Sequence, residues 1–370
     1  MHLGRILFHG ALLGSALAAA ASAPAVAASA SRADLERTLA VTGRHSSARQ
    51  SQAPSRFIRA TRNAAYTYTV LHDFAGAPGD GAGSGAEVAL GATGNIYGTT
   101  DYGGANTYGT IFEITPDGKE SLLHSFGGAG DGSTPDGAVT IESNGDMYGT
   151  TSYGGSSENG VIWKLAADGT YTVVHNFSAD ECNFARGRLV QDKKGNFYTT
   201  CLFGGANLDG TVIKFTPKGK VTVLHNFVGT DGEFPEHNVV MDKDGNIYGV
   251  TAFGGASDNG TIYEIAGDGT FTSLYSFTGG ADGGFPYGAP AIDENGNLYG
   301  SADDGGAYSS GTVFELTAGG TYKVVYNFTG GADGEFPEGD MLLMGKNLYS
   351  TTTEGGANGQ GGVYEVTSKR

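Results

Sequence analysis

Short runs of alternating hydrophobic and polar residues, separated by glycine-rich turns, fill most of the chain. One stretch shows the pattern: residues 137–142 alternate, residues 146–151 follow a Ser-Asn-Gly turn, and residues 161–165 and 171–177 are rich in β-branched and aromatic side chains. Alternation with a period of two is typical of half-buried strands. Asp168-Gly169 lies between the last two runs and predicts a tight hairpin turn. Each such stretch therefore predicts four antiparallel strands.

The stretch repeats six times along the chain. Asn-x-Tyr-type triplets recur every 50 or 51 residues, a Gly-Gly pair follows each triplet, and a phenylalanine closes each period. The triplets end at Tyr97, Tyr148, Tyr198, Tyr248, Tyr299 and Tyr349. Six sets of four strands predict an all-β fold, a six-bladed β-propeller of four-stranded antiparallel blades with the repeated Tyr and Phe packed between blades. An open β-solenoid is the alternative, but a repeat of about 50 residues with four turns is long for one solenoid coil.

The two ends of the repeat region predict how the propeller closes. Its first run, residues 66–74, has the pattern of a fourth strand, and its last run, residues 362–366, has that of a third strand. We expect the N-terminal strand to complete the last blade and close the ring, which removes the exposed edges of an open array. Residues 66–370 then form the propeller.

The first 65 residues have a different composition. Residues 1–30 combine Arg5, an apolar run and small residues, and predict a secretory signal peptide cleaved after Ala27 or Ala30. A membrane anchor is the alternative, which the short, alanine-rich run disfavours. Residues 31–65 hold seven arginines and two acidic residues and predict a basic flexible linker. No later run is long enough to span a membrane, so we expect no integral membrane segment after signal cleavage.

Composition supports this prediction and restricts the partners. Glycine provides 64 of 370 residues, which argues against helices because each glycine inside a helix costs roughly 1 kcal/mol relative to alanine. Residues 66–370 hold 14 Lys and Arg against 37 Asp and Glu, a net charge of −23. Such a surface repels nucleic acid and anionic membranes, so neither is expected as a partner. It is compatible with Ca²⁺, cationic ligands or neutral glycans, although acidity alone is most simply a solubility device.

The repeat is similar to that of a known family. Residues 95–100 (NIYGTT), Gly103-Gly104 and residues 109–114 (GTIFEI), together with a Leu-His-x-Phe run, resemble the GloVer-type tandem repeat of bacterial secreted and surface proteins. The resemblance covers residues 66–370 and implies a propeller-like repeat in a secreted, periplasmic or extracellular protein. It supplies no catalytic residues. Members of this choice-of-anchor group often end in a surface-anchoring segment, whereas only four residues follow Val366, so we expect free secretion or periplasmic residence.

The chain has two cysteines. Cys182 precedes the inner strand of the third blade, and Cys201 ends the second strand of that blade. Both places lie on one face of a propeller blade, so in an oxidising compartment we predict a Cys182–Cys201 disulfide. Such a loop closure contributes about 3 kcal/mol in the chain-entropy model. Two free thiols or a redox pair are the alternatives.

A repeat becomes a binding site where its copies differ. The inner strands should line the channel, and most of their first positions hold glycine, alanine or aliphatic residues. The polar exceptions are Glu87, Arg188, His237, Asn238 and Asp340. They combine two acids, a candidate base and an arginine that could hold a carboxylate, so we expect a binding site at the channel mouth. The plainer interpretation is a solvated entrance with an ion pair.

Two further sets of residues recur around the predicted ring. The residue before each Gly-Gly pair is a candidate rim for sugar rings or cations, with packing between blades as the alternative. These residues are Tyr102, Tyr153, Phe203, Phe253, Asp304 and Glu354. The Asp-Gly loops before the inner strands offer carboxylates for Ca²⁺, although a simple Asp-Gly turn is the favoured interpretation. These carboxylates are Asp80, Asp131, Asp231, Asp282 and Asp333.

Histidine precedes the closing phenylalanine by two residues in four copies, at His72, His124, His175 and His225, and tyrosine takes this position in two. A position that accepts both residues predicts packing rather than metal binding. We also find no nucleophile elbow, phosphate loop, dinucleotide fingerprint or zinc-type spacing.

These observations favour a non-enzymatic, secreted, monomeric binding module for a glycan or for an extracellular or envelope protein. No cofactor is expected apart from candidate Ca²⁺. The first alternative is a lyase or hydrolase that acts on a carbohydrate or lactone at the channel mouth, a hypothesis that rests on fold analogy. The second alternative is a purely structural envelope protein.

Overall fold

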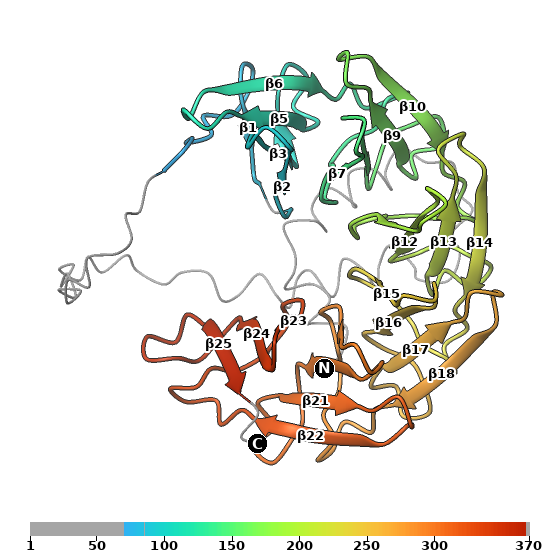
Figure 1. Ribbon diagram of the computed structural model, residues 1–370, viewed down its shortest axis with the longest axis vertical. Coiled ribbons are helices and arrows are strands. Elements are labelled where there is room, and N and C mark those ends of the chain that lie inside the picture. Colours follow the sequence, from blue (N-terminus) through green and yellow to red (C-terminus); the bar gives the residue numbers. More distant parts are fainter. Residues whose placement is uncertain (1–69, 85, 368–370) are drawn as a thin grey trace, which may run out of the picture. The chain divides into compact units, whose positions relative to one another are not determined.

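All regular structure is β-strand in the residues that the computed structural model describes, 70–84 and 86–367. The predicted signal peptide (1–30) and basic linker (31–65) lie outside the described residues. Each sequence repeat forms one antiparallel sheet, in which the first, second, third and fourth strands are neighbours in chain order. In Figure 1 the sheets follow one another around an arc, with the first strands β2, β7, β15 and β23 nearest its centre.

The strands fall into four equivalent sets, one strand of each set per repeat. The first, or inner, strands are β2 (Ala89–Leu90), β7 (Thr140–Ile141), β11 (Val190–Gln191), β15 (Val240–Met241), β19 (Ala291–Ile292) and β23 (Leu342–Met344). The second strands are β3 (Ile96–Thr100), β8 (Met147–Thr150), β12 (Phe197–Cys201), β16 (Ile247–Thr251), β20 (Leu298–Ala302) and β24 (Asn347–Thr352). The third strands are β5 (Thr110–Ile114), β9 (Val161–Leu165), β13 (Thr211–Phe215), β17 (Thr261–Ile265), β21 (Thr312–Leu316) and β25 (Gly362–Thr367). The fourth strands are β6 (Glu120–Ser125), β10 (Tyr171–Asn176), β14 (Val221–Asn226), β18 (Phe271–Ser276) and β22 (Tyr322–Asn327).

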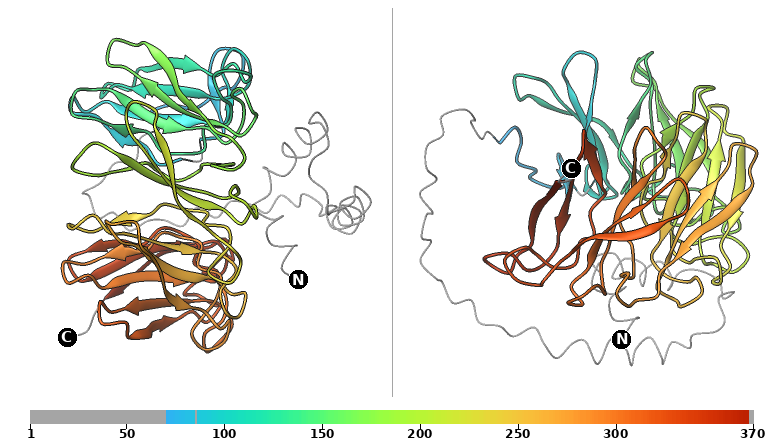
Figure 2. Two further views of the ribbon diagram at one scale, coloured as in Figure 1. Left: turned by 90° about the vertical axis from the view of Figure 1, so that its right-hand side faces the viewer. Right: turned by 60° about the horizontal axis from the view of Figure 1, so that its bottom comes forward.

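Within the described residues this gives five four-stranded sheets, one three-stranded sheet (β23-β24-β25) and a small two-stranded sheet of β1 (Gly81–Ala82) and β4 (Tyr102–Gly103). The left view of Figure 2 shows the sheets of repeats 1 and 2 at the top and those of repeats 5 and 6 at the bottom. The all-β fold of four-stranded antiparallel sheets is thus confirmed, and its arrangement is propeller-like. The inner strands are shorter than the alternating pattern predicts.

Aromatic side chains fill the space between neighbouring repeats. The phenylalanine that follows each fourth strand is at most 1 % exposed at Phe126, Phe177, Phe227, Phe277 and Phe328. Four of these rings contact an aromatic ring in the third strand of the next repeat, with centroid distances of 5.0–6.3 Å. Each hydrophobic cluster accordingly mixes residues of two repeats. The prediction that the repeated aromatic residues pack between repeats is confirmed.

The glycine of the NxYG motif makes room for these rings. Gly149 of β8 pairs with Trp163 of β9, and a Cβ at Gly149 would overlap the indole ring. Gly98, Gly249 and Gly300 face Phe112, Tyr263 and Phe314 in the same way. Repeat 3 has Thr199 in place of glycine, and its partner there is the smaller Ile213. In repeats 1 to 5 the second and third strands therefore vary together in side-chain volume, whereas repeat 6 pairs Ser350 with Tyr364.

A residue with positive φ joins adjacent repeats in the loop before each of five inner strands. The φ angles of Thr134, Phe184, Phe234, Phe285 and Phe336 lie between 54° and 61°. Phe234, for example, donates its N–H to the carbonyl of Asp209 in the preceding repeat (2.9 Å) and accepts from the N–H of Ala252 (3.2 Å). Such a conformation costs on the order of 1–3 kcal/mol at a non-glycine residue, so these hydrogen bonds must hold it in place.

The predicted disulfide is also present. Cys182 and Cys201 are bonded, with their Cα atoms 5.3 Å apart, and both side chains are fully buried. The bond joins the loop before β11 to the end of β12, the two places that the sequence indicated.

The expected closure of the ring by the N-terminal strand is not formed among the described residues. Residues 70–75 belong to no strand, and β25 has no fourth-strand partner. Phe74 nevertheless contacts Phe112 of β5 with a centroid distance of 5.1 Å, as the other closing phenylalanines contact the next repeat. Val363 of β25 is 81 % exposed. Closure and the number of blades therefore stay predictions.

We predict that the volumes of residues 149 and 163 are coupled. Gly149→Thr should lower the free energy of unfolding by about 1–3 kcal/mol, because the side chain has to displace the Trp163 ring. Combining it with Trp163→Ile reproduces the Thr199–Ile213 pair of repeat 3. In the Trp163→Ile background, Gly149→Thr should therefore cost at most half of what it costs in the wild-type protein. Urea unfolding of the four proteins in a double-mutant cycle measures the coupling, and additive effects would contradict this account.

We also predict that residues 66–74 protect the free edge of β25. If they pair with β25 as a fourth strand, deleting them should speed amide hydrogen exchange in residues 363–367 and leave β24 less affected, because paired edge amides exchange slowly. The control is a deletion that ends at residue 65. Equal exchange in both deletion variants would rule out closure by this segment.

Candidate functional site

Six equivalent positions, each two residues before an inner strand, carry side chains that vary between repeats. They hold Glu87, Ala138, Arg188, Asn238, Ala289 and Asp340. Threonine hydroxyls in the second strands fix the neighbouring backbone: Thr150 donates to the Ala185 carbonyl (2.9 Å) and Thr200 to the His237 carbonyl (2.7 Å). The loops that begin the inner strands are thus held by the preceding repeat. We use the word mouth for the region near the centre of the arc where these six positions lie.

Four of the polar mouth residues form one connected network. The Arg188 guanidinium lies 3.4 Å from the Glu87 carboxylate, and the Arg188 backbone N–H donates to the Asn238 side-chain oxygen. The Asn238 side-chain NH₂ donates to Asp340 Oδ2 (2.6 Å). These residues belong to repeats 1, 3, 4 and 6, so the contacts reach past repeats 2 and 5. Side chains that are distant in sequence therefore meet at the mouth.

His237 joins the network through Asp340. Its Nδ1 lies 3.3 Å from Asp340 Oδ1, which also accepts the Ala289 N–H (2.7 Å). Burial alone would lower the pKa of His237, but the hydrogen bond and charge of Asp340 outweigh it and raise that pKa. Burial likewise would raise the pKa of Asp340, and the contacts with His237, Ala289 and Asn238 hold it below its usual range. Each partner favours the charged form of the other. All five predicted mouth residues are thus brought together.

A second polar cluster, which no sequence pattern indicated, lies in the loops beside this network. The Asp136 side chain is only 9 % exposed, and its Oδ2 accepts the Ser152 hydroxyl (2.6 Å) and lies 3.5 Å from Arg186 Nε. Its Oδ1 is buried without a hydrogen-bond partner among the described residues. Burial raises the pKa of Asp136 against the opposing effects of Arg186 and Ser152.

Asp101 provides a second carboxyl group with a raised pKa in this region. Burial, together with the negative charge of Asp136, raises its pKa to about 7, and Arg186 opposes the shift. The charge of Arg186 also acts on His237, so the two clusters share one electrostatic environment. Asp101 directly follows β3, whereas Asp136 and Arg186 each lie four residues before an inner strand. Comparing copies at these two positions, as well as within the inner strands, would have identified them.

The predicted aromatic rim does not form an open platform. Tyr153 and Phe253 are 8 % and 5 % exposed. Tyr153, Phe184, Phe203 and Phe234 contact one another in sequence, with centroid distances of 4.5–5.4 Å. These rings pack between repeats, whereas Tyr102 is 37 % exposed and Glu354 is exposed. Asp304 pairs with Gly284 through an isolated bridge.

The carboxylates of the Asp-Gly loops each contact a histidine or tyrosine of the chain segment that precedes the loop, which for all but Asp80 is the fourth strand of the preceding repeat. Asp131 accepts from His124 Nε2 (3.1 Å) and from the Gly127 N–H (2.6 Å), and Asp231 contacts His225 in the same way. Tyrosine takes the place of histidine beside Asp282 and Asp333. In repeat 3 Glu181 occupies this position and contacts His175 (2.9 Å). Asp80 contacts His72. These contacts fit the turn interpretation, in which the carboxylate fastens the loop.

Within the described part of the chain, no helix has the length and hydropathy that a membrane span needs. No curated protein matches the sequence significantly.

Several solved structures are similar to this one. The extracellular domain of a candidate one-component system of B. thetaiotaomicron aligns with a TM-score of 0.50 and 11 % identity, over 79 % of this chain and 35 % of that one. The extracellular domain of a candidate hybrid two-component system from the same organism aligns with a TM-score of 0.49 and 13 % identity, over 76 % and 33 %. A gluconolactonase of Xanthomonas campestris aligns with a TM-score of 0.41 and 12 % identity, over 75 % and 82 %. The chain spans about a third of the two extracellular domains, and the first likeness concerns the fold alone.

The sequence also matches the model of a repeat family. The match to the Gloeobacter/Verrucomicrobia repeat covers residues 56–244 and 235–370, which confirms the resemblance that the NxYG and Gly-Gly motifs indicated. Because the match covers much more than half of the chain, the protein belongs to the Gloeobacter/Verrucomicrobia repeat family.

Proposed function

We propose that the protein is an extracellular or surface binding module that recognises a neutral glycan at the mouth. The observation that carries this proposal is the network of Glu87, Arg188, Asn238 and Asp340, which come from four repeats. Positions that differ between copies of a repeat are free of the packing that the repeat requires. Polar side chains gathered at such positions are available for a ligand.

The chemistry of the mouth suits a hydroxyl-rich ligand. Glu87 and Asp340 supply hydrogen-bond acceptors, and Arg188 and Asn238 supply donors. The side chains of Arg188 and Glu87 are 51 % and 54 % exposed, so a ligand reaches them without unfolding a loop. The acidic body of the protein disfavours anionic ligands.

Exposed aromatic residues lie in loops on the same side. Tyr102 of β4 is 37 % exposed, and Tyr108 and Tyr308, in loops that follow second strands, are 46 % and 62 % exposed. The Tyr108 carbonyl accepts the N–H of Thr134, which precedes an inner strand, so these loops and the mouth loops are in contact. Aromatic faces around a few polar groups are typical of small-molecule sites.

The disulfide supports an oxidising location. Cys182–Cys201 is fully buried and joins two segments of one repeat. Structural disulfides persist outside the cytosol. Together with the signal peptide expected in residues 1–30, it supports secretion or residence in the periplasm.

The binding proposal predicts a loss of affinity when the mouth is truncated. Calorimetry against neutral oligosaccharides should identify a ligand, and Arg188→Ala combined with Asn238→Ala should weaken it at least tenfold, because two donors are lost at once. Lys243→Ala is the matched control, since Lys243 is 77 % exposed in the turn between β15 and β16, away from the mouth. Unchanged affinity in the double variant, or binding of a protein but no glycan, would refute the proposal.

A second candidate function is a hydrolase or lyase. The observation that favours it is the pKa of about 7 of Asp101, in a cluster whose Arg186 also acts on the His237–Asp340 ion pair. A carboxyl group that titrates near neutrality serves as a general acid or base. An oligosaccharide that binds at the mouth and is cleaved by wild-type protein, but not by the Asp101→Asn variant, would support this function over binding alone.

Titration of Asp101 also makes a prediction for stability. Its pKa is about 7 in the folded protein and about 3.9 in an unfolded chain, so the folded state binds more protons between these values. The stability contributed by Asp101 therefore falls as pH rises from about 4 to 7. Asp101→Asn should raise the Tm by about 2–4 °C at pH 8 and change it little at pH 4.

Differential scanning calorimetry across this pH range checks the prediction. Asp180→Asn is the control, since Asp180 is exposed. A difference in Tm between wild type and Asp101→Asn that is independent of pH would contradict a raised pKa of Asp101.

A further inference from the structure

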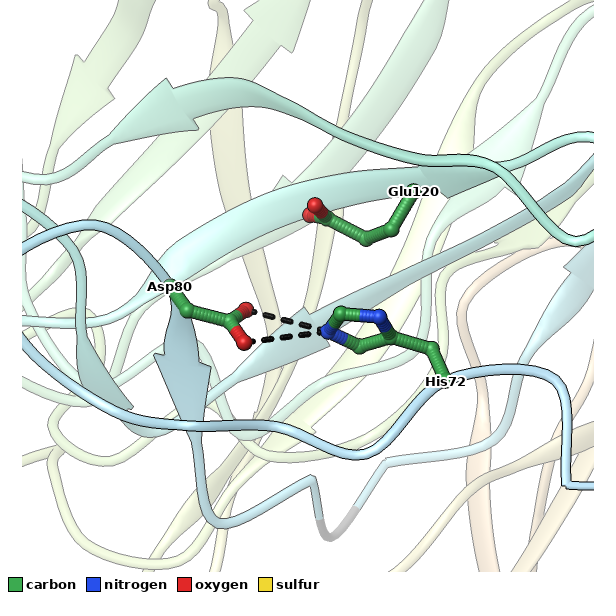
Figure 3. Close-up of side chains that lie close together, drawn as sticks. All are labelled: His72, Asp80 and Glu120. Carbon is green, nitrogen blue, oxygen red and sulfur yellow. Dashed lines mark hydrogen bonds and ion pairs between the residues drawn. The ribbon is translucent and has the colours of Figure 1, made fainter.

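A histidine and two carboxylates meet beside repeat 1. His72 belongs to residues 70–75, Asp80 precedes β1, and Glu120 is the first residue of β6. One ligand atom from each of the three side chains lies within 4.8 Å of the other two. Figure 3 shows the Glu120 carboxylate turned toward Asp80 and the imidazole of His72. His72 Nε2 contacts both oxygens of Asp80, at 3.0 and 3.3 Å.

The histidine–carboxylate pair recurs in other repeats, but the glutamate does not. The other fourth strands begin with Tyr171, Val221, Phe271 and Tyr322. Three of these residues stack flat on the ring of the preceding repeat, with centroid distances of 3.6–3.9 Å, as Tyr171 does on His124. At the equivalent place in repeat 1, the carboxylate of Glu120 lies beside His72, where these repeats have a stacked aromatic ring. This departure is confined to the repeat that adjoins the N-terminal segment.

Glu120 is only half-buried, but one of its carboxylate oxygens lacks a partner. Its Oε1 is shielded from solvent and has no hydrogen-bond partner among the described residues. An unpaired buried oxygen costs free energy, and a second carboxylate nearby adds repulsion. Glu120 takes part in none of the ion pairs found among the described residues. A bound cation would satisfy both carboxylates together.

We propose that His72, Asp80 and Glu120 bind one divalent transition-metal ion of the Zn²⁺ type, which fastens residues 70–75 to repeat 1. One imidazole nitrogen and two carboxylate oxygens are a donor set that Zn²⁺ accepts, with water in the fourth position. Ca²⁺ is disfavoured because it takes six to eight oxygen ligands. Asp80 would keep its hydrogen bonds from the Ala75 and Gly81 N–H groups, which orient its carboxylate. This site is independent of the proposed function at the mouth.

The test compares metal uptake by the full chain, without an affinity tag, after dialysis against EDTA. Glu120→Gln removes the charge at nearly constant volume, and Glu120→Tyr restores the aromatic cover that repeats 2 and 5 have. Glu294→Gln, at an exposed position, is the matched control. After addition of Zn²⁺ and gel filtration, wild type and Glu294→Gln should retain about one equivalent more than either Glu120 variant. Histidines elsewhere contribute equally to all four proteins, so the difference reports this site.

Two further readouts decide between metal binding and a structural role. Zn²⁺ should raise the Tm of wild type and Glu294→Gln but leave the Glu120 variants unchanged, because only a ligand that binds the folded state stabilises it. Co²⁺ should give wild type a visible absorption band of low-coordinate cobalt, which Glu120→Gln lacks. Equal Zn²⁺ retention in wild type and both Glu120 variants, or stabilisation by Ca²⁺ and not by Zn²⁺, would overturn the proposal. Should one Glu120 variant fail to fold, the other decides.

Discussion

The structure depends on one contact that recurs between neighbouring repeats, the packing of the phenylalanine after a fourth strand against the third strand of the next sheet. Each sheet has strands of only two to six residues and cannot bury both of its faces alone. Phe227, for example, contacts Tyr263 of the next repeat at 5.2 Å and is 1 % exposed. Stability therefore resides in the interfaces between repeats, as in other repeat proteins. This dependence explains why the aromatic and glycine positions recur so regularly.

The same constraint determines where the chain is free to vary. The strands that pack between repeats must keep their volumes matched, as Gly149 with Trp163 and Thr199 with Ile213 show. Where the inner strands begin, Val139, Leu189, Val239 and Met341 pack in the hydrophobic clusters, whereas the residue before each of them lies in no cluster and varies between repeats. Because these positions surround one centre, their charges meet, and Asp340 and His237 are held as an ion pair. The raised pKa of Asp101 has the same origin, since burial and the charge of Asp136 act on it together.

Much of the fold followed from the sequence because it is periodic. A pattern repeated six times averages out local ambiguity, and this made the four strands per repeat, the inter-repeat aromatic packing and the Cys182–Cys201 bond predictable. The five mouth residues were found because they interrupt a regular pattern. Asp101 and Asp136 were missed because loop residues are variable and polar in any protein, and only the fold shows which of them are buried. The packing of Tyr153 and Phe253 was undecided for a similar reason, since an aromatic residue before Gly-Gly suits a surface or a core.

The ends of the repeat array raise a separate physical problem. In the described structure, residues 70–75 before repeat 1 form no strand, and β25 of repeat 6 has no fourth-strand partner. Phe74 reproduces the aromatic contact there, but His72 is covered by Glu120 where other repeats supply an apolar side chain. Hydrophobic burial at this place is thus replaced by polar chemistry. An unpaired Glu120 carboxylate costs free energy beside His72 and Asp80. A bound cation would offset that cost, and this need for a partner connects the change at Glu120 to the metal site proposed beside repeat 1.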